Sequence, residues 1–143
     1  MLKGIPNILS PELLKILMEM GHGDEIIIAD GNFPAASYAQ RLIRSDGHAV
    51  PPLLEAILEL FPLDEYVTTP VALMAVAAGD STPTPPIWNT YESILQNHGY
   101  TPDKIDHMER FAFYERAKNV YAIIATGESA IYANVLLKKG VIK

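Results

Sequence analysis

The chain of 143 residues contains no cysteine, a single tryptophan and no long apolar run. Without cysteine it carries no disulfide, no thiolate nucleophile and no cysteine-ligated zinc, a composition suited to the reducing cytosol. The clearest apolar run, residues 71–78, is far shorter than the roughly 18 residues of a membrane-spanning helix. The first residues also lack the cationic head and apolar stretch of a signal peptide. We therefore expect a cytoplasmic protein with no membrane partner.

Positive charge is also scarce, because 11 Lys and Arg stand against 17 Asp and Glu, for a net charge of −6. This balance opposes binding to nucleic acid, which requires a cationic surface. No P-loop, dinucleotide-binding glycine motif or serine-hydrolase motif is present. His48, His98 and His107 are scattered, without the spacing of paired metal ligands. We expect neither a metal nor another cofactor.

Apolar periodicity predicts alternating helices and strands. Helical patterns cover residues 10–21, 51–61, 87–98 and, less regularly, 111–120. Strand patterns cover residues 26–29, 41–44, 71–76, 121–125 and 132–137, of which 41–44 is expected at a sheet edge. This order predicts an α/β fold: a single domain over residues 1–143, with a buried β-sheet flanked by helices.

The last strand has a consequence for assembly. Val135, Leu136 and Leu137 are strongly apolar and lie near the end of the chain. An unpaired apolar edge favours association, and the four expected helices give thin cover to five strands. Left unpaired at an edge, this strand would pack against a neighbouring subunit.

The densest group of chemically active residues surrounds the strand at 26–29. His22 lies between two glycines, and an accessible imidazole can both give and take a proton near neutral pH. Asp30 follows the strand, where α/β proteins collect their sites, and its carboxylate can accept hydrogen bonds from hydroxyl groups. The alternative is that His22 is an ordinary helix-end residue and Asp30 an ordinary turn former.

Two further pairs are candidates. Arg110 and Tyr114 are four residues apart and share a face if this segment is helical, although the residues alone favour a charged surface helix with buried aromatic side chains. Tyr132 and Asn134 are two apart and point the same way if they lie on a strand, where an amide would suit a sugar hydroxyl. A solvent-facing strand is the alternative.

Several strings in order along almost the whole chain resemble the L-fucose mutarotases of the RbsD/FucU family. They are Ser-Pro-Glu-Leu-Leu at 10–14, Met-Gly-His-Gly-Asp-Glu at 20–25, Arg-Phe-Ala-Phe-Tyr-Glu-Arg at 110–116, Thr-Gly-Glu at 126–128 and Tyr-Ala-Asn at 132–134. The second and third strings favour the fucose branch of the family over its ribose branch.

The resemblance implies an RbsD-like fold and a role for each matched residue. It identifies His22 as the catalytic histidine and Tyr114 as a tyrosine involved in proton transfer. It implies sugar contacts for Asp30, Arg110, Tyr132 and Asn134, and further pocket positions for Asp64 and Met74. The family uses no metal or nucleotide, and it forms ring-shaped homo-oligomers, commonly decamers, with sites near subunit contacts.

The implied activity is interconversion of the two anomers of L-fucose or a related monosaccharide by general acid and base catalysis. Two alternatives stay open at this point. One is a non-catalytic sugar-binding module, for which His22 would be dispensable. The other is a ribose-type pyranase that uses the same residues on another sugar.

Overall fold

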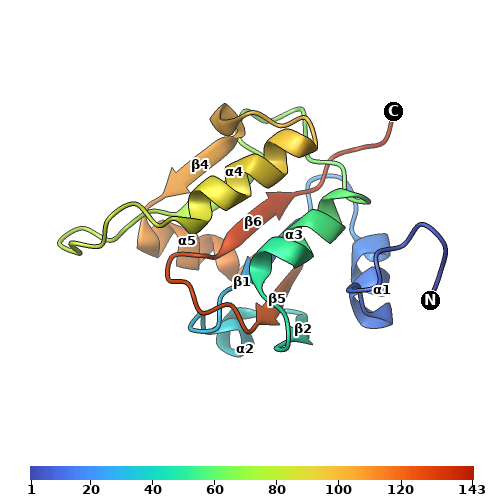
Figure 1. The fold of residues 1–143 in the computed structure, drawn as a ribbon, viewed down its shortest axis with the longest axis horizontal. Helices are drawn as coiled ribbons and strands as arrows, with labels where there is room; N and C mark the ends of the chain where they lie inside the picture. The colour runs from blue at the N-terminus through green and yellow to red at the C-terminus, as the bar shows by residue number, and fades with distance from the viewer.

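Apolar, β-branched runs form the centre of a six-stranded sheet in the computed structural model, which describes residues 1–143 (Figure 1). The elements, in chain order, are α1 (Pro11–Glu19), β1 (Glu25–Ala29), α2 (Ala35–Tyr38), β2 (Leu42–Ser45), α3 (Val50–Leu58), β3 (Val71–Met74), α4 (Ile87–Asn97), the 3₁₀ helix η1 (Pro102–Lys104), β4 (Ile105–Met108), α5 (Arg110–Ala117), β5 (Ala122–Thr126) and β6 (Val135–Lys138). This architecture confirms the predicted α/β class.

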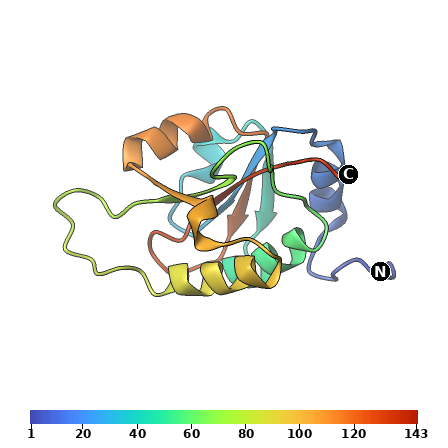
Figure 2. The same cartoon turned by 90° about the horizontal axis from the view of Figure 1, so that it is seen from above.

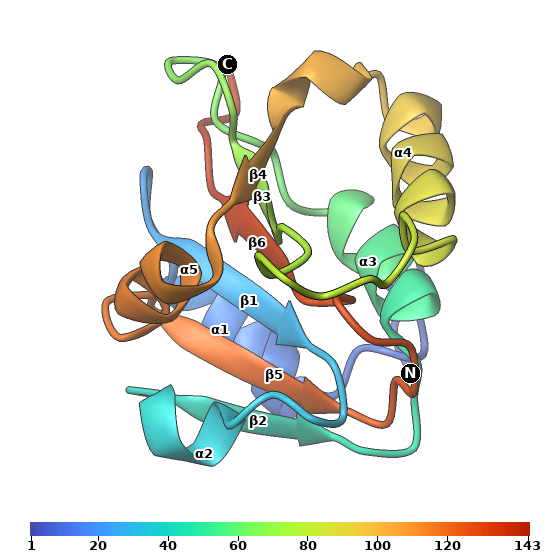
Figure 3. The ribbon, with the colours of Figure 1, turned by 90° about the vertical axis from the view of Figure 1, so that its left-hand side faces the viewer.

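The strand order is β2-β5-β1-β6-β3-β4, and only β6 runs antiparallel to its neighbours (Figure 3). The carboxyl ends of β1, β3, β4 and β5 therefore meet the amino end of β6 at one edge of the sheet. The opposite edge gathers the amino end of β1 and the carboxyl end of β6. Residues that precede and follow β1 in the sequence are consequently separated by the whole length of the strand.

Helices cover the two faces of the sheet unequally (Figure 2). On one face α1, α3 and α4 pack over a core of 27 buried residues, which includes Leu13, Leu53 and Tyr91. On the other face the short helices α2 and α5 cover a core of 12 buried residues. The second face holds the smaller core, and the loops that follow the strands complete its cover.

The helix boundaries follow from local sequence. Ser10 caps α1 by accepting a hydrogen bond from the backbone N–H of Leu13 at 3.1 Å, and Pro11 occupies the first turn, where it sacrifices no helical hydrogen bond. Helix α3 begins at Val50 and ends at Leu58, close to the predicted range of 51–61. No helix of the structure is long and apolar enough to cross a membrane.

Two predictions about the last strand were wrong. Residues 135–137 do not form an edge strand, because β6 pairs with β1 on one side and β3 on the other. All three side chains are fully buried. A strand that is apolar at every position requires cover on both faces, which the centre of a sheet provides. The two edge strands are β2, as predicted, and β4.

The same strand begins later than predicted. It starts at Val135, so Tyr132 and Asn134 lie in the preceding turn and not on a strand. Tyr132 has a φ of 54°, a left-handed conformation that no strand residue adopts. The sequence pattern also missed α2, which has only four residues, and β4, in which Asp106 and His107 interrupt the apolar run.

Candidate functional site

A cavity of about 340 Å³ opens at the sheet edge where the carboxyl ends of the parallel strands meet. This volume is at the small end of the range for ligand pockets. Its walls combine four carboxylate or amide side chains and one guanidinium group with aromatic and aliphatic surface. The lining residues are Asp30, Asn32, Phe33, Met74, Asp80, Arg110, Tyr114, Ile131, Tyr132 and Asn134.

Asp30 and Asn134 form the floor of this cavity and hold each other in place. The backbone N–H of Asp30 donates to Oδ1 of Asn134 at 2.8 Å, which leaves the amide NH₂ of Asn134 available as a donor. The carboxylate of Asp30 accepts from the backbone N–H groups of Asn32 and Phe33, both at 3.0 Å, and of Ala133 at 3.3 Å. Burial raises the pKa of Asp30, and these three bonds oppose the rise.

Helix α5 supplies one wall of the cavity. Arg110 and Tyr114 are one helical turn apart, and the guanidinium carbon of Arg110 lies 5.8 Å from the centroid of the Tyr114 ring. The Tyr114 ring stacks on Phe33 with a centroid distance of 5.5 Å and an interplanar angle of 8°. The hydroxyl of Tyr114 makes no hydrogen bond within the chain. It is therefore available to form a hydrogen bond with a bound molecule.

Two side chains of helix α4 form hydrogen bonds to the turn before β6. The indole N–H of Trp88 donates to the carbonyl of Tyr132 at 2.8 Å, and the buried hydroxyl of Tyr91 donates to the carbonyl of Ala133 at 2.6 Å. Burial raises the pKa of Tyr91, so this phenol keeps its proton and remains a donor. The two bonds fix the backbone from which Tyr132 and Asn134 enter the cavity.

The Thr-Gly-Glu string at 126–128 connects several elements beside Asp30. The hydroxyl of Thr126 donates to the carbonyl of Ala29 at 2.6 Å, and the carboxylate of Glu128 accepts from the backbone N–H of Val50 at 3.1 Å. A Cβ atom at Gly127 would lie 2.2 Å from the carbonyl oxygen of Asp46, so only glycine fits there. These hydrogen bonds connect the end of β5 to the end of β1 and to the start of α3.

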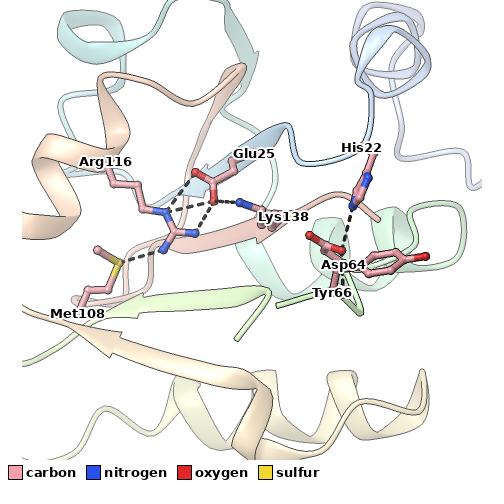
Figure 4. Close-up of polar contacts among 7 residues, drawn as sticks. All are labelled: His22, Glu25, Asp64, Tyr66, Met108, Arg116 and Lys138. Carbon is pink, nitrogen blue, oxygen red and sulfur yellow. Dashed lines mark hydrogen bonds and ion pairs between the residues drawn. The ribbon is translucent and has the colours of Figure 1, made fainter. Parts of the chain in front are cut away.

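A second polar cluster lies at the opposite edge of the sheet, around His22 (Figure 4). His22 Nε2 is 3.1 Å from Oδ1 of Asp64, and the same oxygen accepts the backbone N–H of Tyr66 at 3.0 Å. The rings of His22 and Tyr66 have a centroid distance of 5.4 Å. The bond from Tyr66, followed by that from His22, lowers the pKa of Asp64. The ionised carboxylate can only accept, so Nε2 of His22 carries the proton.

The loop that carries His22 is rigidly anchored. Gly21 donates its backbone N–H to the carboxylate of Asp24 at 2.7 Å, and Gly23 donates to the carbonyl of Lys139 at 2.8 Å. Gly23 has a φ of 87°, which a residue with a side chain rarely adopts. The glycines on both sides of His22 thus place the imidazole at the tip of a fixed turn, with 45% of its side chain exposed.

An ion-pair network flanks this cluster. The guanidinium of Arg116 pairs with the carboxylate of Glu25 through Nε and Nη2, and the ammonium of Lys138 lies 3.9 Å from the same carboxylate. Figure 4 shows that the network lies between α5 and the His22 cluster. Because Glu25 and Lys138 face each other across β1 and β6, the network fixes the register of these strands at this edge.

The residues singled out by sequence therefore fall into two places. The cavity contains Asp30, Met74, Arg110, Tyr114, Tyr132 and Asn134. His22 and Asp64 do not line it, because His22 precedes β1 and Asp30 follows it. The five residues of β1 span roughly 17 Å and separate His22 from the cavity of its own chain.

Four cavity residues were not predicted: Asn32, Phe33, Asp80 and Ile131. Asn32 and Phe33 directly follow Asp30, and their position after a buried strand was the signal that identified Asp30 itself. Asp80 lies in a proline-rich loop after β3 that extends away from the body of the domain (Figure 2). No local pattern connects that loop with the cavity. No group of three His, Asp or Glu side chains converges in a way that would hold a metal ion.

Comparisons with known proteins agree with this architecture. The model of the RbsD / FucU transport protein family matches residues 3–142. Human fucose mutarotase is 51% identical over 146 aligned positions, which cover 99% of this chain and 94% of the human protein.

Two solved structures show which branch of the family this chain resembles more. The crystal structure of the fucose mutarotase from Streptococcus pneumoniae in complex with L-fucose superposes with a TM-score of 0.95 and 53% identity, covering 99% of this chain and 100% of the other. The structure of Bacillus subtilis RbsD complexed with D-ribose gives a TM-score of 0.75 and 25% identity, with 100% of both chains covered. The chain is thus far more similar to the fucose branch.

Proposed function

Because this chain belongs to the RbsD/FucU family, we propose that it is an isomerase that interconverts the α and β anomers of L-fucose. The observation that carries the proposal is the 53% identity, over 99% of the chain, to a mutarotase whose structure contains L-fucose. The 51% identity to human fucose mutarotase supports the same activity. The non-catalytic sugar-binding module is not favoured, since both of these relatives are named as mutarotases.

The cavity offers what recognition of a monosaccharide requires. Sugars present many hydroxyl groups, each of which can donate and accept a hydrogen bond. Asp30 supplies acceptors, whereas Arg110 and the amide NH₂ of Asn134 supply donors. Apolar walls from Phe33 and Met74 suit the hydrocarbon faces of the ring, including the methyl group of fucose. Tyr132, which also lines the cavity, completes the set of proposed sugar contacts.

Anomer exchange requires two proton transfers. One group protonates the ring oxygen while another removes the proton from the anomeric hydroxyl, and the ring opens to the aldehyde. Rotation about the C1–C2 bond then allows closure on the other face. We assign His22 as the principal acid and base and Tyr114 as its partner, each contributing on the order of 10²- to 10⁴-fold. These groups suffice for the chemistry, so the proposal includes neither metal nor cofactor.

Asp64 determines which nitrogen of His22 exchanges the proton. The ionised carboxylate of Asp64 accepts the proton on Nε2, so Nδ1 is the acceptor in the neutral imidazole. In this proposal Asp64 orients the base and does not contact the sugar directly.

The separation of His22 from the cavity of its own chain leads us to include assembly in the proposal. The half-exposed imidazole of one subunit would complete the cavity of a neighbouring subunit in a homo-oligomer. Exposed apolar side chains support such an interface near the His22 edge: Met18 and Ile142 are 84% and 86% exposed, and an apolar groove of about 500 Å³ runs between α1 and the C-terminal segment. A decameric ring and a cytoplasmic location remain proposals that rest on the family resemblance and the cysteine-free sequence.

Saturation-transfer NMR with L-fucose and D-ribose, measured side by side, tests the proposed activity. We expect the protein to accelerate exchange between the α and β signals of L-fucose well above the rate in buffer. Pyranose–furanose exchange of D-ribose should be accelerated less, in keeping with 25% identity to the ribose-binding relative. A protein that leaves L-fucose exchange at the buffer rate would refute the assignment, and faster ribose exchange would favour the pyranase alternative.

A further inference from the structure

Tyr132 is the single non-glycine residue with a positive φ, at 54°, and its side chain is clamped by the loop between β3 and α4. A left-handed conformation is unfavourable for an aromatic residue, so other contacts must hold it. The bond from Trp88 to the Tyr132 carbonyl is one of these. The others involve the phenol, whose oxygen accepts the backbone N–H of Ala77 at 3.2 Å and lies 2.5 Å from Oδ2 of Asp80.

Asp80 is held in position independently of Tyr132. Its second oxygen, Oδ1, accepts from the backbone N–H of Thr82 at 2.9 Å and from the Thr82 hydroxyl at 2.6 Å. These bonds leave Oδ2 aimed at the phenol. The bonds from Thr82, followed by that from Tyr132, lower the pKa of Asp80, so the carboxylate is ionised at neutral pH.

The direction of the hydrogen bond between Asp80 and Tyr132 follows from this charge. An ionised carboxylate only accepts, so the phenol of Tyr132 donates its one proton to Asp80. One lone pair of the phenol oxygen is used by Ala77. A single lone pair remains. Toward a molecule in the cavity, which both side chains line, Tyr132 can therefore act only as an acceptor.

We propose that Asp80 is a positioning residue of the sugar site: it fixes the proton of Tyr132 so that the phenol oxygen accepts a hydrogen bond from one sugar hydroxyl. This inference rests on the proposed function and extends it to a residue outside the motifs that identify the family. It also assigns a role to the proline-rich loop of residues 75–86, which would form a wall of the site through Ala77 and Asp80.

The substitution Asp80→Asn tests the proposal because it reverses the hydrogen bond without removing the side chain. The amide oxygen can still accept from Thr82, whereas the amide NH₂ would donate to the phenol. Tyr132 would then turn its own proton toward the sugar, where an acceptor is required. We expect L-fucose exchange to fall by about tenfold, the effect of one mismatched hydrogen bond to the sugar.

Asp103→Asn is the matched control. Asp103 is also exposed, its carboxylate also accepts from a threonine hydroxyl two residues away, and its pKa is also lowered. It lies in η1, outside the cavity, so this variant carries the same change in net charge without touching the site. Its exchange rate and its dissociation constant for L-fucose should equal those of the wild type.

Tyr132→Phe, alone and combined with Asp80→Asn, separates a role through the phenol from a general role in ordering the loop. Without the phenol there is no proton to fix, so Asp80→Asn should cause no further loss in the Tyr132→Phe background. The dissociation constant for L-fucose is measured together with the exchange rate, so that a variant too slow to assay is still compared by binding.

Two results would overturn the inference. One is a wild-type exchange rate and affinity for Asp80→Asn. The other is a loss of the same size with and without the Tyr132 hydroxyl, which would show that Asp80 acts independently of the phenol. Failure of the proposed function is distinguishable from both, because then the wild-type protein itself would leave L-fucose exchange at the buffer rate.

Discussion

His22 and Asp64 combine an exposed imidazole with a buried carboxylate. Their Nε2 and Oδ1 atoms are 3.1 Å apart, and the side chains are 45% and 3% exposed. Such a pair presents a base to an outside molecule while its orienting group stays shielded from solvent. The pair lies at the end of the sheet opposite the cavity. In the proposed mechanism it therefore acts on the cavity of a neighbouring subunit, and its function depends on assembly.

Replacing His22 with alanine or asparagine should abolish accelerated L-fucose exchange, with a loss of about 10²- to 10⁴-fold, because the principal proton-transfer group is gone. The measurement is saturation-transfer NMR on protein that keeps its native circular dichroism. His48→Ala is the control, since His48 is exposed and lies in neither the cavity nor the His22 cluster. A folded His22→Ala protein with the wild-type rate would remove His22 from the mechanism.

Asp64→Asn should destabilise the fold by about 1 kcal/mol at pH 7, since hydrogen bonds to the charged carboxylate are weakened. The folded-state pKa of Asp64 is lowered. Its stabilising contribution is therefore present above the unfolded pKa of about 3.9 and is lost as the pH falls through the folded value. Urea unfolding of both proteins should show a stability gap at pH 7 that shrinks below about pH 4.

The exposed Asp106 provides the control for this pH dependence, because its carboxyl group makes no hydrogen bond in the chain. Asp106→Asn should leave a gap that is small at every pH. If the gap between wild type and Asp64→Asn stays constant down to acid pH, the ionised state of Asp64 contributes nothing to folding.

Tyr91→Phe should cost about 1 to 3 kcal/mol of unfolding free energy, because it leaves the buried carbonyl of Ala133 without its donor. The ring of Tyr91 is fully buried and its shape is kept, so packing loss is small. Thermal or urea unfolding measures the effect, with the 70% exposed Tyr66→Phe as control. Equal stability of the two variants would show that water replaces the lost donor.

Most of the fold was accessible from the sequence because its signals are local. Ser10 and Pro11 mark the start of α1, and the run of isoleucines at 26–28 marks a buried strand, whatever the rest of the chain does. The position of β6 was not accessible in this way. An apolar triplet such as Val135 to Leu137 predicts burial on both faces, but pairing with β1 and β3 is decided by contacts over more than 60 residues of sequence.

The cavity shows the same distinction between local and distant signals. Asp30 was singled out by its place after a strand. Helical spacing put Arg110 and Tyr114 on one face, and the family resemblance assigned them to the site. All three line the cavity. Tyr132 and Asn134 reach it for a different reason from the one predicted. They enter from a turn that contains a left-handed residue and whose backbone is held by Trp88 and Tyr91 of a distant helix. Asp80 depends on the path of a long loop, for which neither spacing nor periodicity gives a signal.

The last prediction concerns whether one site is built from two chains. Arg110→Ala disables the cavity, and His22→Ala disables the imidazole, so each variant alone should be inactive. If His22 of one subunit serves the cavity of another, unfolding and co-refolding the two variants together creates some sites with His22 from the Arg110→Ala chain and an intact cavity from the His22→Ala chain. At equal amounts and random assembly, about one quarter of all sites carry both intact halves.

Activity in the mixed protein is decisive, because neither variant can regain a complete site within its own chain. We expect L-fucose exchange to return to about a quarter of the wild-type rate after co-refolding, and to stay absent when the two variants are refolded separately and then combined without subunit exchange. His22 lies at the amino end of β1 and Arg110 at the cavity beyond its carboxyl end, so sharing between subunits is the arrangement that lets both act on one sugar. A co-refolded mixture with no activity, from variants that each form wild-type-sized oligomers, would show that the catalytic groups of a site come from a single chain.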